Sequence, residues 1–412
     1  MTHPLLPVDA RDPRRVFEAL REALSGGPAI NPRIDDSVPS DLPAEVEKKV
    51  VLVIETSGST GHAKRVGLSA EALLAGAAAA DAALAGPGQW VLALPAHYVA
   101  GTNVLVRSLA ASTVPAFVPR GHFDPVAFVA AAEGLVHPTR YTSLVPAQLT
   151  TLLDAGPAAV RALGRFDAVL VGGQATPLAL LSRARGAGVR VVRTYGSSET
   201  SGGCVYDGVP VGRTRAAVVD GELQLSGPTL AEYYLADPAR TAAAFVERDG
   251  VRWYRTGDAG SISSDGVVTV TGRLDDVFIS GGEKVSLGVV ERLVRELPGL
   301  SGAVVVRAPD ARWGEVPVVV VGGAGTGAGA GGAGAAGGAV LPSLGAIRAA
   351  VVAGAGRAAA PARLLTVDAL PLLASGKPDR VALTRLAGLD AAAAAAAPGR
   401  NEFSPGDTSS TA

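Results

Sequence analysis

The chain carries the stretch ETSGSTGHAK at residues 55–64, directly after the apolar run Val50–Ile54. The run is typical of a buried strand. The glycines and small hydroxyl residues that follow let backbone amides approach an anion closely, and Lys64 adds a positive charge at the end. The stretch therefore predicts a phosphate-binding loop between a strand and a helix that Ser69 caps. A flexible Gly/Ser loop is the alternative.

The spacing of this loop differs from that of a Walker loop, which ends in adjacent Gly-Lys-Ser/Thr. Here two residues separate Gly61 from Lys64. The sequence therefore disfavours a P-loop kinase or NTPase.

Composition narrows the class of protein. A length of 412 residues predicts two or more domains. A formal net charge of −1 argues against a nucleic-acid partner. The single cysteine, Cys204, excludes an intramolecular disulfide and fits a reducing compartment. Because we find neither a secretory signal nor a long lipophilic stretch, we expect a cytoplasmic protein without membrane insertion.

The order of the elements predicts the fold class. Residues 50–194 alternate strand-like and helix-like segments, which is typical of a parallel sheet with helices packed on it. Residues 1–49 resemble a lead-in with one helix at Val16–Ala23. Residues 209–271 contain short strands, with Asp220-Gly221 as a hairpin turn, and predict a small β-rich subdomain.

Beyond this subdomain, residues 272–282 are a charged connector bounded by glycines, and a second α/β unit follows. The Gly/Ala-rich segment 322–339 predicts a floppy loop. Residues 391–412 predict a disordered tail.

Four further stretches contain residues that neither packing nor turns require. In Tyr195–Glu199, which follows a strand, the tyrosine can stack on a nucleobase and the carboxylate can bind a divalent cation carried by phosphates. In Tyr254–Asp258, the carboxylate suits a ribose diol. Gly272–Lys284 contains Arg273, a phosphate or ribose ligand, among glycines that suit a hinge. Ser375–Arg380 contains Lys377, whose charge reaches the first loop only if the domains close. Turns and surface side chains are the alternatives.

In order and spacing, these stretches resemble the core motifs of the superfamily of acyl/aryl-CoA synthetases, adenylation domains and luciferases, over residues 50–385. The resemblance implies an α/β fold with a large N-terminal domain, residues 1–272, that has parallel sheets flanked by helices and a small β-rich subdomain. A hinge at 273–276 then precedes a small mobile α+β domain at 277–390. It also implies a two-step ligase, in which a carboxylate attacks ATP to form acyl-AMP and a thiol then displaces AMP.

The resemblance implies a role for each motif residue. The phosphate loop would contain Thr56, Ser57, Gly58, Ser59, Thr60, Gly61 and Lys64. Tyr195 would stack on adenine beside Gly173 and Gly196. Ser198 would contact phosphate and Glu199 would bind Mg²⁺. Asp258 would bind the ribose and Arg273 the ribose or phosphate. Asp275 would act as the hinge residue, and Lys377 would stabilise charge during adenylation. The motif departs from the family at Ala63 and Ser198, where proline and threonine are usual.

The acyl side is similar to o-succinylbenzoate–CoA ligases of menaquinone biosynthesis, in the segments 94–101 and 142–149 and in Arg107. This implies an aryl carboxylate substrate with a second carboxylate, whose burial requires a cation or several donors. Arg107, Thr142 and Ser143 would supply them, with Gly172 beside the acyl group. His97 would line the pocket near the reacting carboxyl. A packing histidine and a surface arginine are the alternatives.

The partners expected are therefore the acid, ATP with Mg²⁺, and coenzyme A, with a homodimer left open. Rival hypotheses are another small-acid CoA ligase, a stand-alone adenylating enzyme and a nucleotide-binding regulator without catalysis. Lys377 argues against the regulator, which needs no transition-state lysine.

Overall fold

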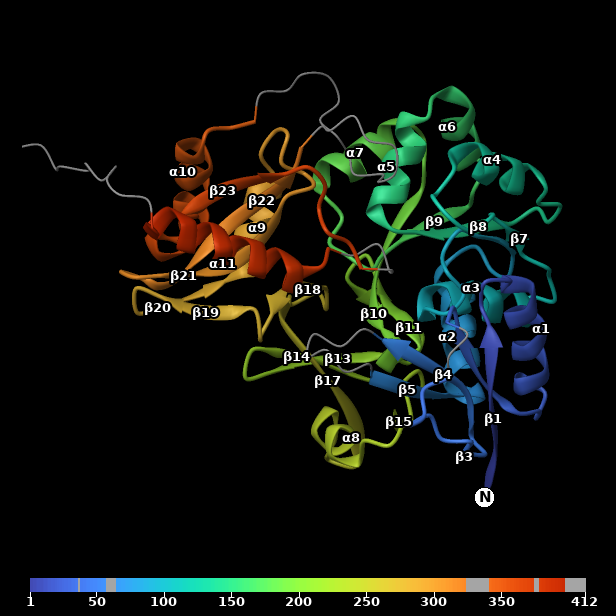
Figure 1. Cartoon of the computed structure of the whole chain (residues 1–412). Helices are drawn as coiled ribbons and strands as arrows, with labels where there is room; N and C mark the ends of the chain where they lie inside the picture. Colours follow the sequence, from blue (N-terminus) through green and yellow to red (C-terminus); the bar gives the residue numbers. More distant parts are fainter. Residues whose placement is uncertain (36–37, 57–63, 324–340, 374–377, 397–412) are drawn as a thin grey trace, which may run out of the picture.

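The computed structural model describes residues 1–412 except 36–37, 57–63, 324–340, 374–377 and 397–412, and for residues 390–396 it describes the backbone alone. Four sheets and their helices make up this part of the chain (Figure 1). No helix within it combines the length and the apolar character that crossing a membrane would require.

The first sheet carries the predicted phosphate loop. It has six strands in the order β15-β5-β4-β2-β1-β3. Strands β1, β2 and β4 run parallel, and β4 pairs antiparallel with β5. The bounds are β1 (Thr2–Asp9), β2 (Ala29–Arg33), β3 (Glu45–Glu47), β4 (Val50–Thr56), β5 (Lys64–Ser69) and β15 (Tyr233–Tyr234).

The second sheet is the predicted parallel sheet. Its order is β12-β11-β10-β9-β8-β6-β7, and the strands from β7 to β10 run parallel. Strands β11 and β12 add an antiparallel edge. The bounds are β6 (Gln89–Leu92), β7 (Ala116–Phe117), β8 (Arg140–Leu144), β9 (Ala168–Val171), β10 (Val191–Ser197), β11 (Gly202–Tyr206) and β12 (Val209–Pro210).

Helices cover both faces of the second sheet, as its strand alternation requires. One apolar core joins α1, α2 and α3 to the two sheets on either side, with Leu20, Leu73 and Trp90 fully buried. A second core joins the opposite face to α4, α5, α6 and α7. The bounds are α1 (Pro13–Leu24), α2 (Ala70–Ala83), α3 (Val99–Ala110), α4 (Pro125–Glu133), α5 (Pro146–Asp154), α6 (Pro157–Leu163) and α7 (Leu178–Gly186).

The third sheet is the predicted β-rich subdomain and is antiparallel throughout. Its order is β13-β14-β17-β16, with β18 beside β17. Asp220 and Gly221 have φ of 50° and 79° in the turn between β13 and β14, as the predicted hairpin requires. The bounds are β13 (Arg215–Val219), β14 (Glu222–Ser226), β16 (Phe245–Arg248), β17 (Val251–Ile262), β18 (Val268–Arg273) and the neighbouring helix α8 (Pro238–Ala244).

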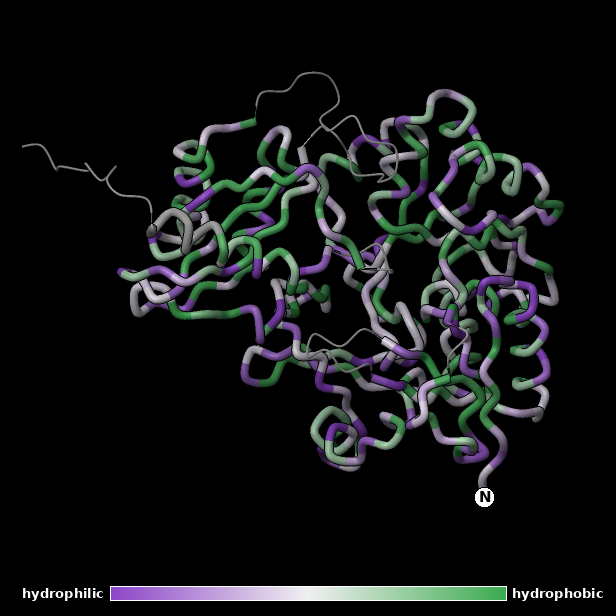
Figure 2. Tube along the Cα trace, in the orientation of Figure 1, coloured by the Kyte–Doolittle hydropathy of each residue, from purple (hydrophilic) through white to green (hydrophobic). Residues whose placement is uncertain are grey.

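The fourth sheet forms the C-terminal body. Its order is β20-β19-β22-β21, and β23 pairs in parallel with β22. Helices α9 and α10 pack on one face and α11 on the other. Hydrophobic segments follow these strands in Figure 2. The bounds are β19 (Val277–Ser280), β20 (Glu283–Ser286), β21 (Val304–Asp310), β22 (Gly314–Gly322), β23 (Arg363–Val367), α9 (Leu287–Arg295), α10 (Leu344–Ala355) and α11 (Arg380–Ala396).

The apolar cores divide the chain near the predicted hinge. The two C-terminal cores contain only residues from Phe278 onward, and the other cores contain none beyond Val268. The domain limits themselves, 1–272, 273–276 and 277–390, stay predictions.

Three expectations need correction. Residues 1–49 are not a lead-in, because β1, β2 and β3 belong to the first sheet and β1 lies inside it. The short runs around prolines concealed these strands. The connector 272–282 contains strand β19, in which Phe278 and Ser280 face the interior. The expected tail begins as helix, because α11 continues to Ala396. Residues 397–412 and most of the Gly/Ala-rich segment lie outside the described residues.

Candidate active site

The parallel strands of the second sheet bring several predicted residues to one edge. Strands β6, β8, β9 and β10 run in the same direction, so their carboxyl ends lie together. His97 follows β6, Gly172 and Gly173 follow β9, and Ser198 and Glu199 follow β10. This edge is where open α/β sheets bind their ligands.

The phosphate loop is closed at its base by strand pairing. Thr56 at the end of β4 lies opposite Lys64 at the start of β5. Ser57, Gly58, Ser59, Thr60 and Gly61 lie outside the described residues. The base is braced by charges, because Glu55 pairs with Arg33 on one side and accepts a 2.8 Å hydrogen bond from Arg65 Nε on the other. Arg65 also pairs with Asp41.

The predicted adenine and ribose residues form one hydrogen-bonded group. The Tyr195 hydroxyl donates to Asp258 Oδ2 over 2.5 Å, and Arg273 Nη1 donates to Asp258 Oδ1 over 3.2 Å. Arg273 also donates to the Thr256 carbonyl. Burial raises the pKa of Asp258, although Tyr195 and Arg273 oppose the shift. Burial, followed by the Asp258 charge, raises the pKa of the Tyr195 hydroxyl, which keeps it a donor.

The predicted hinge residue belongs to the same group. Asp275 accepts from Arg273 through both oxygens, at 2.9 Å and 3.1 Å. These hydrogen bonds hold the pKa of Asp275 below its usual range. The predicted hinge residue is thus joined to a predicted ribose residue. Lys377 lies outside the described residues.

Ser198 and Glu199 lie in a single 3₁₀ turn, η1 (Ser198–Thr200), and both are buried. Glu199 is 6% exposed and its Oε1 accepts a 2.7 Å hydrogen bond from the Tyr234 hydroxyl. A carboxylate oxygen has two acceptor positions, so one hydrogen bond leaves Glu199 able to bind a cation. This buried acid has the chemistry that Mg²⁺ on a nucleotide requires.

The glycines of the site are required by close approaches. A Cβ on Gly172 would lie 2.4 Å from Thr194 Oγ1, and one on Gly196 would lie 2.0 Å from the Gly202 carbonyl. Gly173 has φ of 80°, which favours glycine. The backbone therefore turns tightly at the ends of β9 and β10, where small residues were predicted.

His97 is half-buried, and neither ring nitrogen has a hydrogen-bond partner in the described structure. Its ring lies 4.0 Å from that of Tyr98. Burial, with a smaller effect of Arg120, lowers the pKa of His97 to about 4. The side chain is therefore a neutral imidazole near pH 7. It is not the satisfied packing histidine of the alternative hypothesis.

Arg107 is buried, not a surface arginine as in the alternative. It is 5% exposed, lies over the Trp90 ring at 4.9 Å and donates to the Tyr206 hydroxyl over 3.0 Å. Its Nε has no partner within the described structure. One helical turn earlier, Asn103 donates to the Ser201 carbonyl over 2.6 Å. This face of α3 is thereby held against the chain that follows Glu199.

Thr142 and Ser143 lie on opposite faces of β8, because side chains alternate along a strand. The Thr142 hydroxyl donates to the Val91 carbonyl over 3.1 Å, and the residues opposite Thr142 on the two neighbouring strands, Val91 and Val169, belong to the core beneath α4–α7. Ser143 instead shares the face of Tyr141, which packs against Trp90 under Arg107. The structure brings Ser143, but not Thr142, to the side of Arg107.

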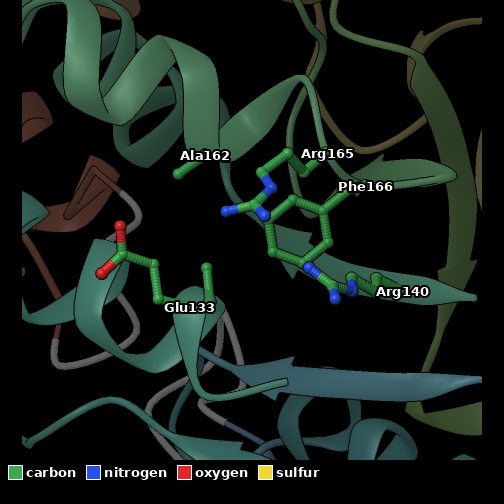
Figure 3. A pocket seen from close by; sticks show the side chains of 6 residues that line it. Glu133, Arg140, Ala162, Arg165 and Phe166 are labelled. Carbon is green, nitrogen blue, oxygen red and sulfur yellow. The ribbon is translucent and has the colours of Figure 1, made fainter. Parts of the chain in front are cut away.

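A small pocket elsewhere contains none of the predicted residues. It is lined by Ala132, Glu133, Arg140, Ala162, Arg165 and Phe166, between α4, α6 and the start of β8. In Figure 3, Arg140 and Arg165 flank the Phe166 ring, and Glu133 extends from α4. These side chains come from α4, α6, the loop after α6 and the first residue of β8, and not from the carboxyl ends of the strands that gather the motifs.

Comparison with known proteins identifies the family of this chain. The sequence profile of AMP-binding enzymes matches residues 10–240. A protein of Mycobacterium tuberculosis named a probable 2-succinylbenzoate–CoA ligase is 41% identical over 347 residues, which span 83% of this chain and 85% of that protein. The chain belongs to the AMP-binding enzyme family.

Other relatives of this AMP-binding enzyme agree. The 2-succinylbenzoate–CoA ligase of Salmonella typhimurium is 31% identical and covers 77% of this chain, which spans 70% of that protein. The o-succinylbenzoate-CoA synthetase of Bacillus subtilis, solved with its acyl-adenylate, has a TM-score of 0.68 at 22% identity, covering 92% of this chain and 78% of that one. The predicted superfamily and fold class are confirmed.

Sequence reasoning missed several residues that contact the predicted site residues. Glu55, Arg65, Asn103 and Tyr206 support predicted residues, and Tyr234 contacts Glu199. Tyr234 follows a recognisable turn-rich stretch, but its hydroxyl reaches a residue 35 positions away. Nothing in the local pattern indicates such a contact.

Proposed function

We propose that the chain ligates 2-succinylbenzoate to coenzyme A for menaquinone biosynthesis. The succinyl carboxylate attacks the α-phosphate of ATP, and the bond to the leaving pyrophosphate breaks. The CoA thiol then attacks the acyl carbon, AMP leaves, and a thioester forms. The observation that carries this proposal is the 41% identity, over 83% of the chain, to the Mycobacterium tuberculosis protein.

In this proposal the Tyr195–Asp258–Arg273 group binds the adenosine. Asp258 accepts one hydrogen bond at each oxygen, which leaves acceptor positions for the ribose hydroxyls. Tyr195 stacks on adenine beside Gly173 and Gly196. Thr56, Lys64 and the loop 57–61 hold the β- and γ-phosphates, and Ser198 contacts phosphate.

Mg²⁺ enters with the nucleotide in this proposal. Glu199 supplies the protein oxygen, because it is a buried acid at a strand end whose one described side-chain partner is a neutral hydroxyl. The ion would neutralise charge on the phosphates. Glu199 itself orients the ion and so fixes where the phosphates lie.

On the acyl side, the proposal assigns the aromatic carboxylate to Arg107. A buried carboxylate requires a cation, and Arg107 is a buried cation with an Nε that lacks a partner in the described structure. Ser143 lies on the same side of the sheet. Gly172 makes room for the acyl chain, and neutral His97 lines the site near the reacting carboxyl. We do not retain Thr142 as a contact.

Lys377 is proposed to stabilise the charge that develops during adenylation, after which the C-terminal domain at 277–390 rotates about Asp275. Replacing Lys377 by alanine should reduce acyl-AMP formation by about 100-fold or more. Thioester formation from supplied acyl-AMP should be nearly unchanged. An equal loss of both steps would contradict this role.

The experiment that tests the substrate is acid-dependent ATP–pyrophosphate exchange. We expect exchange with 2-succinylbenzoate and much less with benzoate, 4-chlorobenzoate or fatty acids. Exchange with one of those acids but not with 2-succinylbenzoate would instead favour another acyl-CoA ligase. Exchange without any thioester on addition of CoA would favour a stand-alone adenylating enzyme, and no exchange with any acid would favour a regulator. Size measurement in the same buffer tests the homodimer.

A further inference from the structure

Strand β15 joins two parts of the proposed site that are far apart in sequence. It pairs with β5, whose first residue is Lys64, with Tyr234 opposite Val66 and Tyr233 opposite Gly67. The backbone amide of Ala231, just before β15, donates to the Glu199 carbonyl over 2.8 Å. The chain from 231 to 234 therefore connects the phosphate loop to the turn that contains Glu199.

Tyr234 makes this connection through its side chain as well. It is 4% exposed, and its hydroxyl donates to Glu199 Oε1 over 2.7 Å. Phe245 packs against it at 5.8 Å and against Tyr254 at 5.3 Å, so the ring is confined within an aromatic row. A confined ring holds its hydroxyl in one place, and that hydroxyl in turn limits the orientations of the Glu199 carboxylate.

The same ring lies beneath the lysine of the phosphate loop. Lys64 Nζ is 5.8 Å from the centre of the Tyr234 ring, within the range of a cation–π interaction. One side chain thus contacts both the acid assigned to Mg²⁺ and the lysine assigned to the phosphates.

We propose that Tyr234 is a positioning residue that holds the Glu199 carboxylate at the Mg²⁺ position and Lys64 at the phosphate position. The inference rests on the proposed function, because it takes the ligand to be Mg²⁺–ATP. The hydroxyl orients the Glu199 carboxylate, and the ring face contacts Lys64. The two effects are therefore separable by substitution.

Chemistry supports this division. The Tyr234 hydroxyl is an uncharged group that donates to Glu199 Oε1 from a buried ring. A neutral donor fixes a carboxylate without cancelling its charge, and the charge is what binds the cation. A lysine or arginine in the same place would compete with Mg²⁺ for Glu199.

The test is ATP binding by calorimetry to the purified full-length protein, with excess Mg²⁺ and again with a chelator. Tyr234→Phe keeps the ring and loses the hydroxyl. We expect its ATP affinity to fall about tenfold with Mg²⁺, the worth of a hydrogen bond to a charged group, and to change little without it. Tyr234→Leu also loses the ring and should weaken binding by a further factor of about three in both conditions.

The matched control is Tyr233→Phe, on the same strand, whose hydroxyl accepts a long 3.4 Å hydrogen bond from the Glu47 amide. It should bind ATP as the unsubstituted protein does. An equal loss for Tyr234→Phe with and without Mg²⁺ would indicate a merely structural role and overturn the inference, as would no loss at all. Because no acid is present, failure of 2-succinylbenzoate as substrate leaves this result unaffected.

Discussion

The proposed nucleotide side and the proposed acyl side of the site differ in how their polar side chains are hydrogen-bonded. On the nucleotide side, Tyr195, Asp258 and Arg273 are hydrogen-bonded to one another. On the acyl side, both ring nitrogens of His97 and the Nε of Arg107 are buried without a partner in the described structure. The three side chains of the proposed nucleotide half thus have partners within the protein, whereas the proposed acyl half contains buried nitrogens that have none in the described structure.

The difference indicates how each half meets its ligand. A satisfied group keeps its geometry before ATP arrives and loses little entropy when it binds. An unsatisfied buried group costs free energy until a ligand pairs with it, and a site built in this way rejects ligands that lack the matching group. We therefore expect the nucleotide side to depend on internal contacts and the acyl side to determine which acid is accepted.

Among the variants that test this comparison, the largest effect should come from Asp258→Asn. An amide oxygen does not accept from both Tyr195 and Arg273 as the carboxylate does, and its NH₂ group faces another donor. We expect kcat/KM for ATP to fall about 100-fold, since one hydrogen bond to a charged group is lost and the other is made to a neutral oxygen. Asp249→Asn, at an exposed hairpin with φ of 53°, is the control. An unchanged KM for ATP would end the argument that this half is pre-formed.

Arg107→Lys should affect the acid alone. Lysine keeps the charge but not the planar fork that lies on Trp90 and reaches Tyr206. We expect KM for 2-succinylbenzoate to rise about tenfold while KM for ATP changes less than about twofold, as measured by pyrophosphate exchange. Tyr206→Phe, which removes only the described partner, should give a smaller rise. Equal changes in both KM values would mean that Arg107 supports the fold and not the acid.

The sequence predicts the helices and strands whose residue pattern is regular, and it does not predict strands that depend on distant pairing partners. Ser69 accepts a hydrogen bond from the Ala72 amide in the helix that it caps, as its position predicts. The local pattern does not predict β1, which includes Pro4 and Pro7, because its pairing with β2 and β3, and not its own residue pattern, makes it a strand.

The site residues that belong to a single motif were predictable, but the contacts between distant motifs were not. Asp258 and Arg273 were assigned separately, and the structure joins them because β17 pairs with β18 in the register that places Asp258 opposite Arg273. The contact of Tyr234 with Glu199 depends instead on a strand pairing between β15 and β5 that no local pattern encodes. Tertiary pairing supplied what spacing did not.

The pH dependence of stability tests whether His97, in the proposed acyl half, is buried without hydrogen-bond partners. Its pKa is lowered to about 4 from 6.5, so the unfolded chain binds a proton more readily than the folded one between these values. Stability therefore falls as pH drops from 6.5 to 4 and gains nothing above 6.5. His97→Gln should lose this dependence. Its thermal midpoint should therefore drop less between pH 7 and pH 4.5 than that of the unsubstituted protein, by about 1–2 °C.

The control for that series is His122→Gln, since His122 is exposed. Parallel curves for His97→Gln and the unsubstituted protein would show that the His97 ring gains partners that the described structure lacks. The acyl half would then resemble the nucleotide half.

The smallest effect should separate the two faces of β8. Thr142→Val removes a hydroxyl that donates to the Val91 carbonyl, on the face away from Arg107. The free energy of unfolding should fall by about 1 kcal/mol, the net worth of one hydrogen bond, and KM for the acid should change less than about twofold. Ser143→Ala, one residue on and facing the other way, should instead raise that KM with little change in stability. A Thr142→Val variant that weakens acid binding as much as Ser143→Ala would show that the acyl site reaches through the sheet, because strand alternation permits only one of the two side chains to face it.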